Sequence, residues 1–194
     1  MIIEQAIYDG TLIHQRFAYR YFRGHVSPVG NIVAFRAPMK VEAAGMIDSE
    51  DILSNDFIYS KDAMNFCWEI PNLDPFGAVA FQRLFNTQLA NILSNNFIKK
   101  PIEVDGDDLM VHAEHQQRGI VQQKGKCSVS ITYSKNNVAL GHTAINIVAG
   151  DEAPIFAYST NLSNEQVKQF LNAGVIVFNE TVQDIFKATT KVIC

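Results

Sequence analysis

The sequence predicts an α+β fold in which helices pack on one face of a mostly antiparallel β-sheet. Three observations lead to this prediction. The apolar residues of one central segment recur at helical spacing, two later segments have the composition of neighbouring strands, and strands and helices do not alternate strictly along the chain. Strict alternation would indicate a parallel, doubly wound sheet, whereas runs of strands followed by helices favour an antiparallel sheet.

The first predicted strand covers residues 30–36, where β-branched and aromatic residues follow a turn. Pro38 cannot donate a hydrogen bond to a neighbouring strand, so we expect this strand to end there. A helix is predicted over residues 74–94, because Asp74 can cap it and Pro75 suits its first turn. Arg83 lies in or beside the apolar stripe of this helix, where it either finds a charged partner or reaches solvent.

Residues 109–111 are expected to form a short strand, and the polar segment 112–126 a mobile loop. Two strands follow. Residues 128–133 alternate polar and apolar side chains, and residues 139–148 are apolar almost throughout, as in a strand covered on both faces. Residues 134–137 between them predict a hairpin turn.

The C-terminal region predicts two helices, over residues 164–171 and 180–189, with a break at residues 172–174. Ser163 or Asn164 is expected to cap the first of them, because short polar side chains accept hydrogen bonds from the free amides of a helix start.

Length and composition indicate an ordinary globular protein, since 47% of the 194 residues are hydrophobic and 19% are charged. No repeat or low-complexity linker divides the chain, so we expect residues 1–194 to form a single domain. The net charge of -4 disfavours bulk nucleic-acid binding, which depends on Lys and Arg. Neither a leader sequence nor an apolar run of about 20 residues is present, so we expect a soluble protein without a membrane partner.

The three cysteines, Cys67, Cys127 and Cys194, are widely spaced and form no CxxC pair. Free thiols in a reducing compartment fit this pattern best, so we expect a cytoplasmic protein. The oligomeric state is left open, with a homodimer as one alternative.

Self-sufficient catalytic motifs are absent: the sequence contains no phosphate loop, GxGxxG pattern, HExxH helix or nucleophile elbow. His142 and Asn146 lie four residues apart in an apolar strand and so share one face. Buried polar side chains need hydrogen-bond partners, and this pair either forms a core network or lines a ligand site. Lys126, at a predicted strand start, either binds a carboxylate or phosphate in a pocket or is solvated.

Four arginines, Arg16, Arg20, Arg23 and Arg36, cluster near the N-terminus, where they form either a solvated face or a local basic pocket. The spacing of His112, Glu114 and His115 would suit a transition metal only if another ligand joined them. Exposed polar residues are the simpler interpretation, so we predict no metal site.

Two motifs carry a resemblance to known enzymes. The segments Lys126–Ile131 and Gly141–Ile147 resemble the paired signature of biotin protein ligases and lipoyl or octanoyl transferases. This resemblance implies a biotin/lipoate ligase-like fold, which is class II synthetase-like. It also implies that Lys126 contacts an acyl carboxylate or its activated form, while His142 and Asn146 shape the pocket.

More of the chain resembles the prokaryotic family called domain of unknown function 366. The shared segments are residues 32–36, 46–48 followed by 50–51, 82–84, 106–109, 128–131 and 145–146. This second resemblance supports the fold and specifies no reaction.

We therefore expect an enzyme that acts on a small carboxylate or acyl ligand. Lys126 and His142 are the candidate catalytic residues, and the candidate substrate-binding residues are Asn146, Ser128, Arg20, Arg36 and Arg83. The cofactor is left unknown, with ATP as one candidate. Residues 20–24 hold one glycine instead of the ligases' Gly/Arg-rich loop, and residues 148–161 lack the cysteine of octanoyltransferases.

Two rival functions remain. In the first, the same pocket senses a small anion without catalysis, and the Gln-rich segment 112–123 meets a protein partner. In the second, His112, Glu114 and His115 serve a metal-dependent hydrolase.

Overall fold

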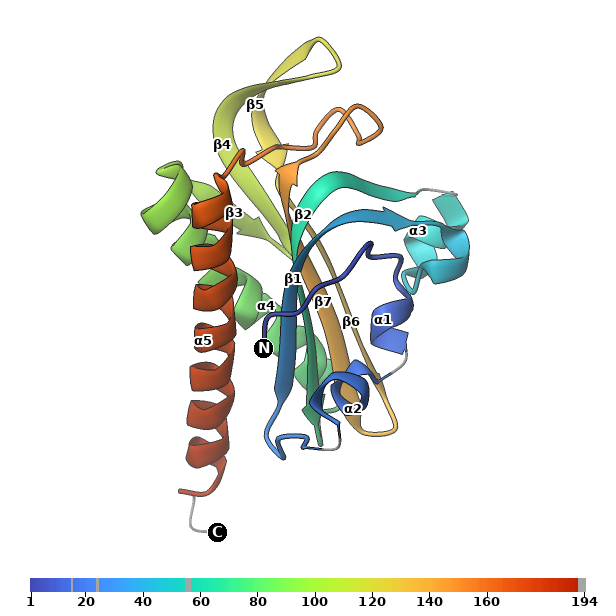
Figure 1. Cartoon of the computed structure of the whole chain (residues 1–194), viewed down its shortest axis with the longest axis vertical. Coiled ribbons are helices and arrows are strands. Elements are labelled where there is room, and N and C mark those ends of the chain that lie inside the picture. The colour runs from blue at the N-terminus through green and yellow to red at the C-terminus, as the bar shows by residue number, and fades with distance from the viewer. Residues whose placement is uncertain (15, 24, 55–56, 192–194) are drawn as a thin grey trace.

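The fold is built on two antiparallel sheets. Figure 1 shows the computed structural model, which describes residues 1–14, 16–23, 25–54 and 57–191. The main sheet has the strand order β1-β2-β7-β6, with β1 at Asn31–Val41, β2 at Ile58–Pro71, β6 at Ser128–Lys135 and β7 at Val138–Val148. The smaller sheet has the order β3-β4-β5, with β3 at Ile102–Asp105, β4 at Asp108–Gln117 and β5 at Ile120–Lys126.

Two long helices cover one face of the main sheet, α4 (Pro75–Ile92) and α5 (Asn164–Thr189) (Figure 1). A π-helical turn, Leu93–Ile98, extends α4. The rings of Phe66, Phe85 and Phe178 are fully buried between sheet and helices, and Phe66 meets Phe85 edge to face at 6.0 Å. Each such side chain contributes roughly 1.5–3 kcal/mol through burial, which makes this layer the main core.

The opposite face is covered by the N-terminal segment and two short helices, α1 (Thr11–His14) and α2 (Phe17–Phe22). The segment runs parallel to the outer edge of β1, where the Tyr8 amide donates to the Pro38 carbonyl at 2.9 Å. The α+β class is therefore confirmed, with the long helices on one face as predicted. The short helices on the other face were not predicted from the sequence.

Strand β1 does not end at Pro38, as predicted, but continues to Val41. The pairing with β2 shifts between Ala37 and Met39, so Pro38 occupies a bulge. A bulge is one of the few places in a sheet where a residue without an amide hydrogen fits. Beyond β1, a short turn at Ala43–Gly45 and helix α3 (Ser49–Ser54) lead towards β2.

Residues 112–126 form most of a hairpin, β4 and β5, instead of the expected loop. Its turn residues Arg118 and Gly119 have φ of 51° and 79°, the pair of positive angles that a two-residue hairpin turn needs. The hairpin predicted between β6 and β7 is confirmed, with its turn at Asn136 and Asn137.

The break predicted at residues 172–174 is also wrong, because α5 is one continuous helix. Its predicted cap is confirmed: Ser163 and Gln166 form a capping box. Gly174 lies where the helix approaches the sheet most closely, since a Cβ atom there would stand 2.4 Å from Cε1 of Phe66. Of the helices in the described part of the chain, none is both long and apolar enough to span a bilayer.

Replacing Gly174 with alanine should destabilise the protein. The Phe66 ring is fully buried between the rings of Phe85 and Phe170, so it cannot move aside freely. Overpacking should outweigh the better helix propensity of alanine, for a net loss of about 1–2 kcal/mol in urea unfolding. Asn172→Ala, at an exposed position of the same helix, is the control and should be neutral or slightly stabilising. A higher melting temperature for Gly174→Ala would contradict this packing argument.

Candidate functional site

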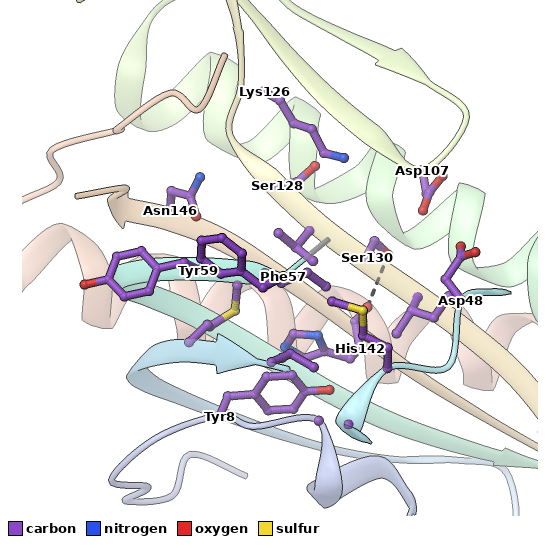
Figure 2. A pocket seen from close by; sticks show the side chains of 18 of the residues that line it. Tyr8, Asp48, Phe57, Tyr59, Asp107, Lys126, Ser128, Ser130, His142 and Asn146 are labelled. Atoms are coloured by element: carbon purple, nitrogen blue, oxygen red, sulfur yellow. Dashed lines mark hydrogen bonds between the residues drawn. The ribbon is translucent and has the colours of Figure 1, made fainter. Parts of the chain in front are cut away.

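A cavity of about 440 Å³ lies on the face of the main sheet opposite α4 and α5, and β1, β2, β6 and β7 all contribute to its lining (Figure 2). Most of its walls are apolar, and its polar side chains come from several elements, among them β6, β7, the β3–β4 turn and the segment before α3. Its lining comprises Tyr8, Gly10, Ile13, Met39, Val41, Gly45, Met46, Ile47, Asp48, Phe57, Ile58, Tyr59, Asp107, Asp108, Lys126, Ser128, Val129, Ser130, Ile131, His142, Asn146, Pro154, Phe156 and Ala157.

The two sheets meet at Cys127, between the end of β5 and the start of β6. Its amide donates to the Leu109 carbonyl at 2.9 Å, and its carbonyl accepts from the Asn146 amide at 2.8 Å. Burial raises the pKa of the Cys127 thiol to about 12, so this sulfur stays protonated at neutral pH and is no nucleophile. The backbone of Cys127 therefore links the two sheets and fixes the orientation of the residues on either side of it.

Lys126 is fixed by that link and by the segment that follows β7. Its amide donates to the Phe156 carbonyl and its own carbonyl accepts from the Tyr158 amide, both at 2.8 Å. The ammonium forms an ion pair with the Asp108 carboxylate at 2.6 Å, and both side chains are about one-third exposed. In Figure 2, Lys126, Ser128 and Asp107 lie on one side of the cavity, opposite Tyr8 and His142.

His142 forms part of the cavity floor and is neutral. Its ring stacks on Tyr8 at a centroid distance of 3.7 Å, and Nε2 lies 3.0 Å from Oδ1 of Asn65. The Asn65 amide nitrogen donates to the carbonyls of Ala37 and Ala63, so Oδ1 is an acceptor and His142 Nε2 carries the hydrogen. Burial lowers the pKa of His142 to about 3, so the ring is uncharged at neutral pH.

Asn146 is held rigidly at the opposite end of the strand face it shares with His142. Its backbone bonds with Cys127 and Thr160 lock the residue in place. The residue is 4% exposed, and its side-chain Oδ1 is buried without any hydrogen-bond partner. Such an oxygen costs about 1–3 kcal/mol until a donor reaches it, so it marks a place for a ligand group.

Ser128 and Ser130 are already engaged with their surroundings. Ser128 Oγ accepts from the Leu109 amide at 2.8 Å. Ser130 Oγ accepts from Gln82 and Asn86 of α4 at 2.8 and 3.1 Å. The contact of Ser128 holds its side chain in the cavity wall, and the contacts of Ser130 attach β6 to α4.

The predicted site residues therefore divide into two groups. Lys126, Ser128, His142 and Asn146 line one cavity, whereas the three predicted arginines do not. Arg20 is exposed on α2, and Arg36 pairs with Asp62 and donates to Asn164 on the face covered by the long helices. Arg83 reaches the cavity rim indirectly, through an ion pair with Asp107 at 3.5 Å.

The residues of the metal hypothesis also have other contacts. His112 Nε2 lies 2.8 Å from Glu103, and the His115 ring packs edge to face against Tyr158. Within the residues that the structure describes, no group of three or more His, Cys, Asp or Glu side chains is arranged to hold a metal ion.

Sequence reasoning missed the acidic side of the cavity. Asp48, Asp107 and Asp108 entered the predictions only as members of segments shared with the family called domain of unknown function 366, yet all three line the cavity. The sequence holds no local signal for this, because the β3–β4 turn reaches Lys126 only after the two sheets join at Cys127.

The segment 150–157, between β7 and α5, forms one wall and is tied to the β4–β5 hairpin, which projects beyond the main sheet (Figure 1). Arg118 donates to the carbonyls of Asp151 and Glu152 at 2.7 and 2.8 Å, and Gln117 donates to that of Gly150 at 2.6 Å. Phe156, from the same segment, lines the cavity. The hairpin tip thus positions a cavity wall.

Comparison with known proteins identifies the family and the fold. The family model described as Domain of unknown function (DUF366) matches residues 1–193. The solved structure of a protein of unknown function from Pyrococcus horikoshi superposes with a TM-score of 0.80 at 24% identity, over 100% of this chain and 97% of that one. Among curated proteins, none matches the sequence.

Two ligase structures share the fold at lower similarity. One is the bipartite lipoate protein ligase of Thermoplasma acidophilum, described with its E2 lipoyl domain (TM-score 0.52, 12% identity, 94% of this chain and 85% of that one). The other is the biotin protein ligase of Aquifex aeolicus in complex with biotin and ATP (TM-score 0.55, 13% identity, 94% of this chain and 70% of that one). The predicted biotin/lipoate ligase-like fold is confirmed.

The buried neutral His142 should make stability depend on pH. An unfolded histidine takes up a proton below its ordinary pKa of 6.5, whereas the folded one stays neutral down to about pH 3. The unfolded state therefore binds more protons between these values, and stability falls as pH decreases, by up to about 1.4 kcal/mol per pH unit. Urea unfolding from pH 7 to pH 4 should show a flatter profile for His142→Gln than for the wild type; parallel profiles would contradict a neutral buried ring.

Removing the guanidinium of Arg118 should loosen the wall segment. Arg118→Asn keeps a residue that tolerates the positive φ of the turn while deleting the two bonds to residues 151 and 152. Amide hydrogen exchange in residues 150–157 should become faster, with the rest of the chain unchanged. Arg20→Ala, at an exposed position of α2, is the control. Equal exchange rates in both variants would show that the hairpin does not hold this wall.

Proposed function

We propose that this chain, which belongs to the family described as domain of unknown function 366, binds a small carboxylic acid with an apolar body in the cavity beside β6. Its carboxylate would pair with Lys126, and its apolar body would lie against the floor and walls. The observation that carries this proposal is the position of Lys126: among the described lining residues it is the only lysine or arginine.

The geometry supports this assignment in two ways. A volume of about 440 Å³ lies within the usual range of small-molecule sites, and mostly apolar walls with a few polar groups are typical of them. In addition, the Lys126 ammonium is paired with a side chain that is partly exposed, so a ligand carboxylate can take the place of Asp108. The similar fold of a Thermoplasma acidophilum protein with bound lipoic acid and of a biotin protein ligase in complex with biotin adds support for an acid of this kind.

An enzyme acting on a carboxylate or acyl group is the first form of this proposal. Lys126 would then stabilise the negative charge that develops on the acyl oxygen or on its activated form. His142, neutral and held by Asn65, would shape the floor and supply no charge. Arg20 and Arg36 do not enter this proposal, because they lie away from the cavity.

A non-catalytic acid sensor is the second form, and one observation favours it. Lys126 is the only lysine or arginine among the described lining residues and is already paired with Asp108, so the lining offers little positive charge to the triphosphate of ATP. Binding of an acid without activation needs no further positive charge.

Calorimetric titration with octanoate, lipoate and biotin tests the shared proposal. At least one of these acids should bind the wild type, and Lys126→Ala should weaken that binding by about 10-fold or more, because a charge-assisted contact is lost. Lys124→Ala is a matched control: Lys124 lies on the same strand and pairs with Glu103 at 2.6 Å, away from the cavity. Equal affinities for both variants, in folded proteins of wild-type melting temperature, would refute the role of Lys126.

Pyrophosphate exchange then separates the two forms. An adenylating enzyme should exchange labelled pyrophosphate into ATP when magnesium and the bound acid are both present. Binding of the acid without any exchange excludes the adenylating enzyme and agrees with the sensor.

A further inference from the structure

We infer that the acid bound at Lys126 also carries an amine, so that the ligand is an apolar amino acid held as a zwitterion. This inference rests on the proposed function and names the substrate class for the same cavity. Two independent observations carry it: the charges around Lys126, and the unpartnered oxygen of Asn146.

The charges favour a ligand with both signs. Lys126 and Asp108 are already paired at 2.6 Å, so a ligand carboxylate that takes the ammonium leaves the Asp108 carboxylate without its partner. An amine-free acid would therefore exchange one ion pair for another and leave a half-buried negative charge. A zwitterion would replace the single pair by two, with its carboxylate on Lys126 and its ammonium on Asp108.

A second carboxylate also favours a ligand that carries an ammonium group. Asp107 lines the cavity beside Asp108 and is only partly compensated, by Arg83 at 3.5 Å. At this end of the cavity a ligand ammonium would be attracted by the Asp107 carboxylate, whereas a ligand carboxylate would be repelled by it.

Asn146 supplies the second observation. Its Oδ1 is buried and unpartnered on a residue that is 4% exposed and lines the cavity, so it requires a hydrogen-bond donor. An ionised carboxylate has no hydrogen to donate, while an ammonium has three. The backbone amide of Asn146 donates to the carbonyl of Cys127, the residue after Lys126, so Asn146 lies beside the chain segment that carries Lys126, and both residues line the cavity.

The rest of the ligand is set by the walls. Apolar side chains make up much of the lining, among them Met39, Val41, Ile131, Phe57 and Phe156, so the amino acid should carry an apolar side chain.

Calorimetric titration with matched ligands tests the inference. The series is L-phenylalanine, L-leucine and L-methionine, their amine-free analogues 3-phenylpropanoate and 4-methylpentanoate, and phenethylamine, which lacks the carboxylate. At least one amino acid should bind about 10-fold or more tightly than its amine-free analogue, and more tightly than the amine. Lys126→Ala should weaken the binding of the amino acid more than the binding of the other ligands.

Two substitutions test whether Asp108 and Asn146 cause the preference for the amino acid over its amine-free analogue. Asp108→Asn should reduce the advantage of the amino acid over its amine-free analogue about 10-fold, because the partner of the ammonium is gone. Asn146→Ala should reduce the same ratio about 5-fold or more, because the acceptor is gone. Asp105→Asn, at the end of β3 and outside the cavity lining, is the matched control and should leave the ratio unchanged.

The outcomes separate this inference from the proposed function. If the amine-free acids or octanoate bind as well as the amino acids and still depend on Lys126, the inference fails and the proposed function stands. The inference also fails if octanoate binds and no amino acid does. If phenethylamine binds as tightly as phenylalanine and Lys126→Ala changes nothing, both fail.

Discussion

The junction at Cys127 is the constraint on which the cavity depends. One residue bonds through its amide to the smaller sheet and through its carbonyl to the main sheet, and its side chain is fully buried. Because neither sheet can rotate around it without breaking one of these bonds, the neighbours on both sides keep fixed directions. Lys126 and Asn146 come together for this reason, although one ends the hairpin strand β5 and the other lies within β7.

A second layer of polar contacts supports the junction from the helix side. Ser130, Thr143 and Asn86 bond to one another within 3.1 Å, and all three are buried. Asn86 also donates to the Asp107 carbonyl at 3.0 Å. Helix α4 thus fastens the edge strand β6 and the acidic turn at once, which fixes the carboxylates of the turn relative to Lys126. Buried networks of this kind favour one arrangement because every alternative leaves polar groups unpaired.

The sequence predicted the parts of the fold that depend on local pattern. Apolar periodicity located α4, and strand alternation located β6 and β7 with the turn between them, so the common face of His142 and Asn146 followed from their spacing in β7. Lys126 was expected at a strand start but is the last residue of β5, and its place in the cavity depends on the junction at Cys127. The β4–β5 hairpin escaped prediction because Arg118 is an unusual residue for a turn with positive φ. Gly174 resembled a helix end, although its small size serves the contact with Phe66. The arginines could not be placed, because strand alternation turns Arg36 towards α5 and only the assembled sheet shows which face holds the cavity.

The stacking of Tyr8 on His142 has a consequence for the order in which the molecule folds. The floor of the cavity joins a residue that precedes β1 to one in β7, so on the ribosome the first partner must wait until nearly three-quarters of the chain has been made. Contacts between residues so far apart in the sequence form late, because closing a long loop lowers the entropy of the chain before any favourable contact is made. During synthesis α4 and the β1–β2 pair can form before the binding cavity exists, whereas α5 follows β7 in the chain. A nascent chain would therefore gain part of its framework well before it could hold a ligand.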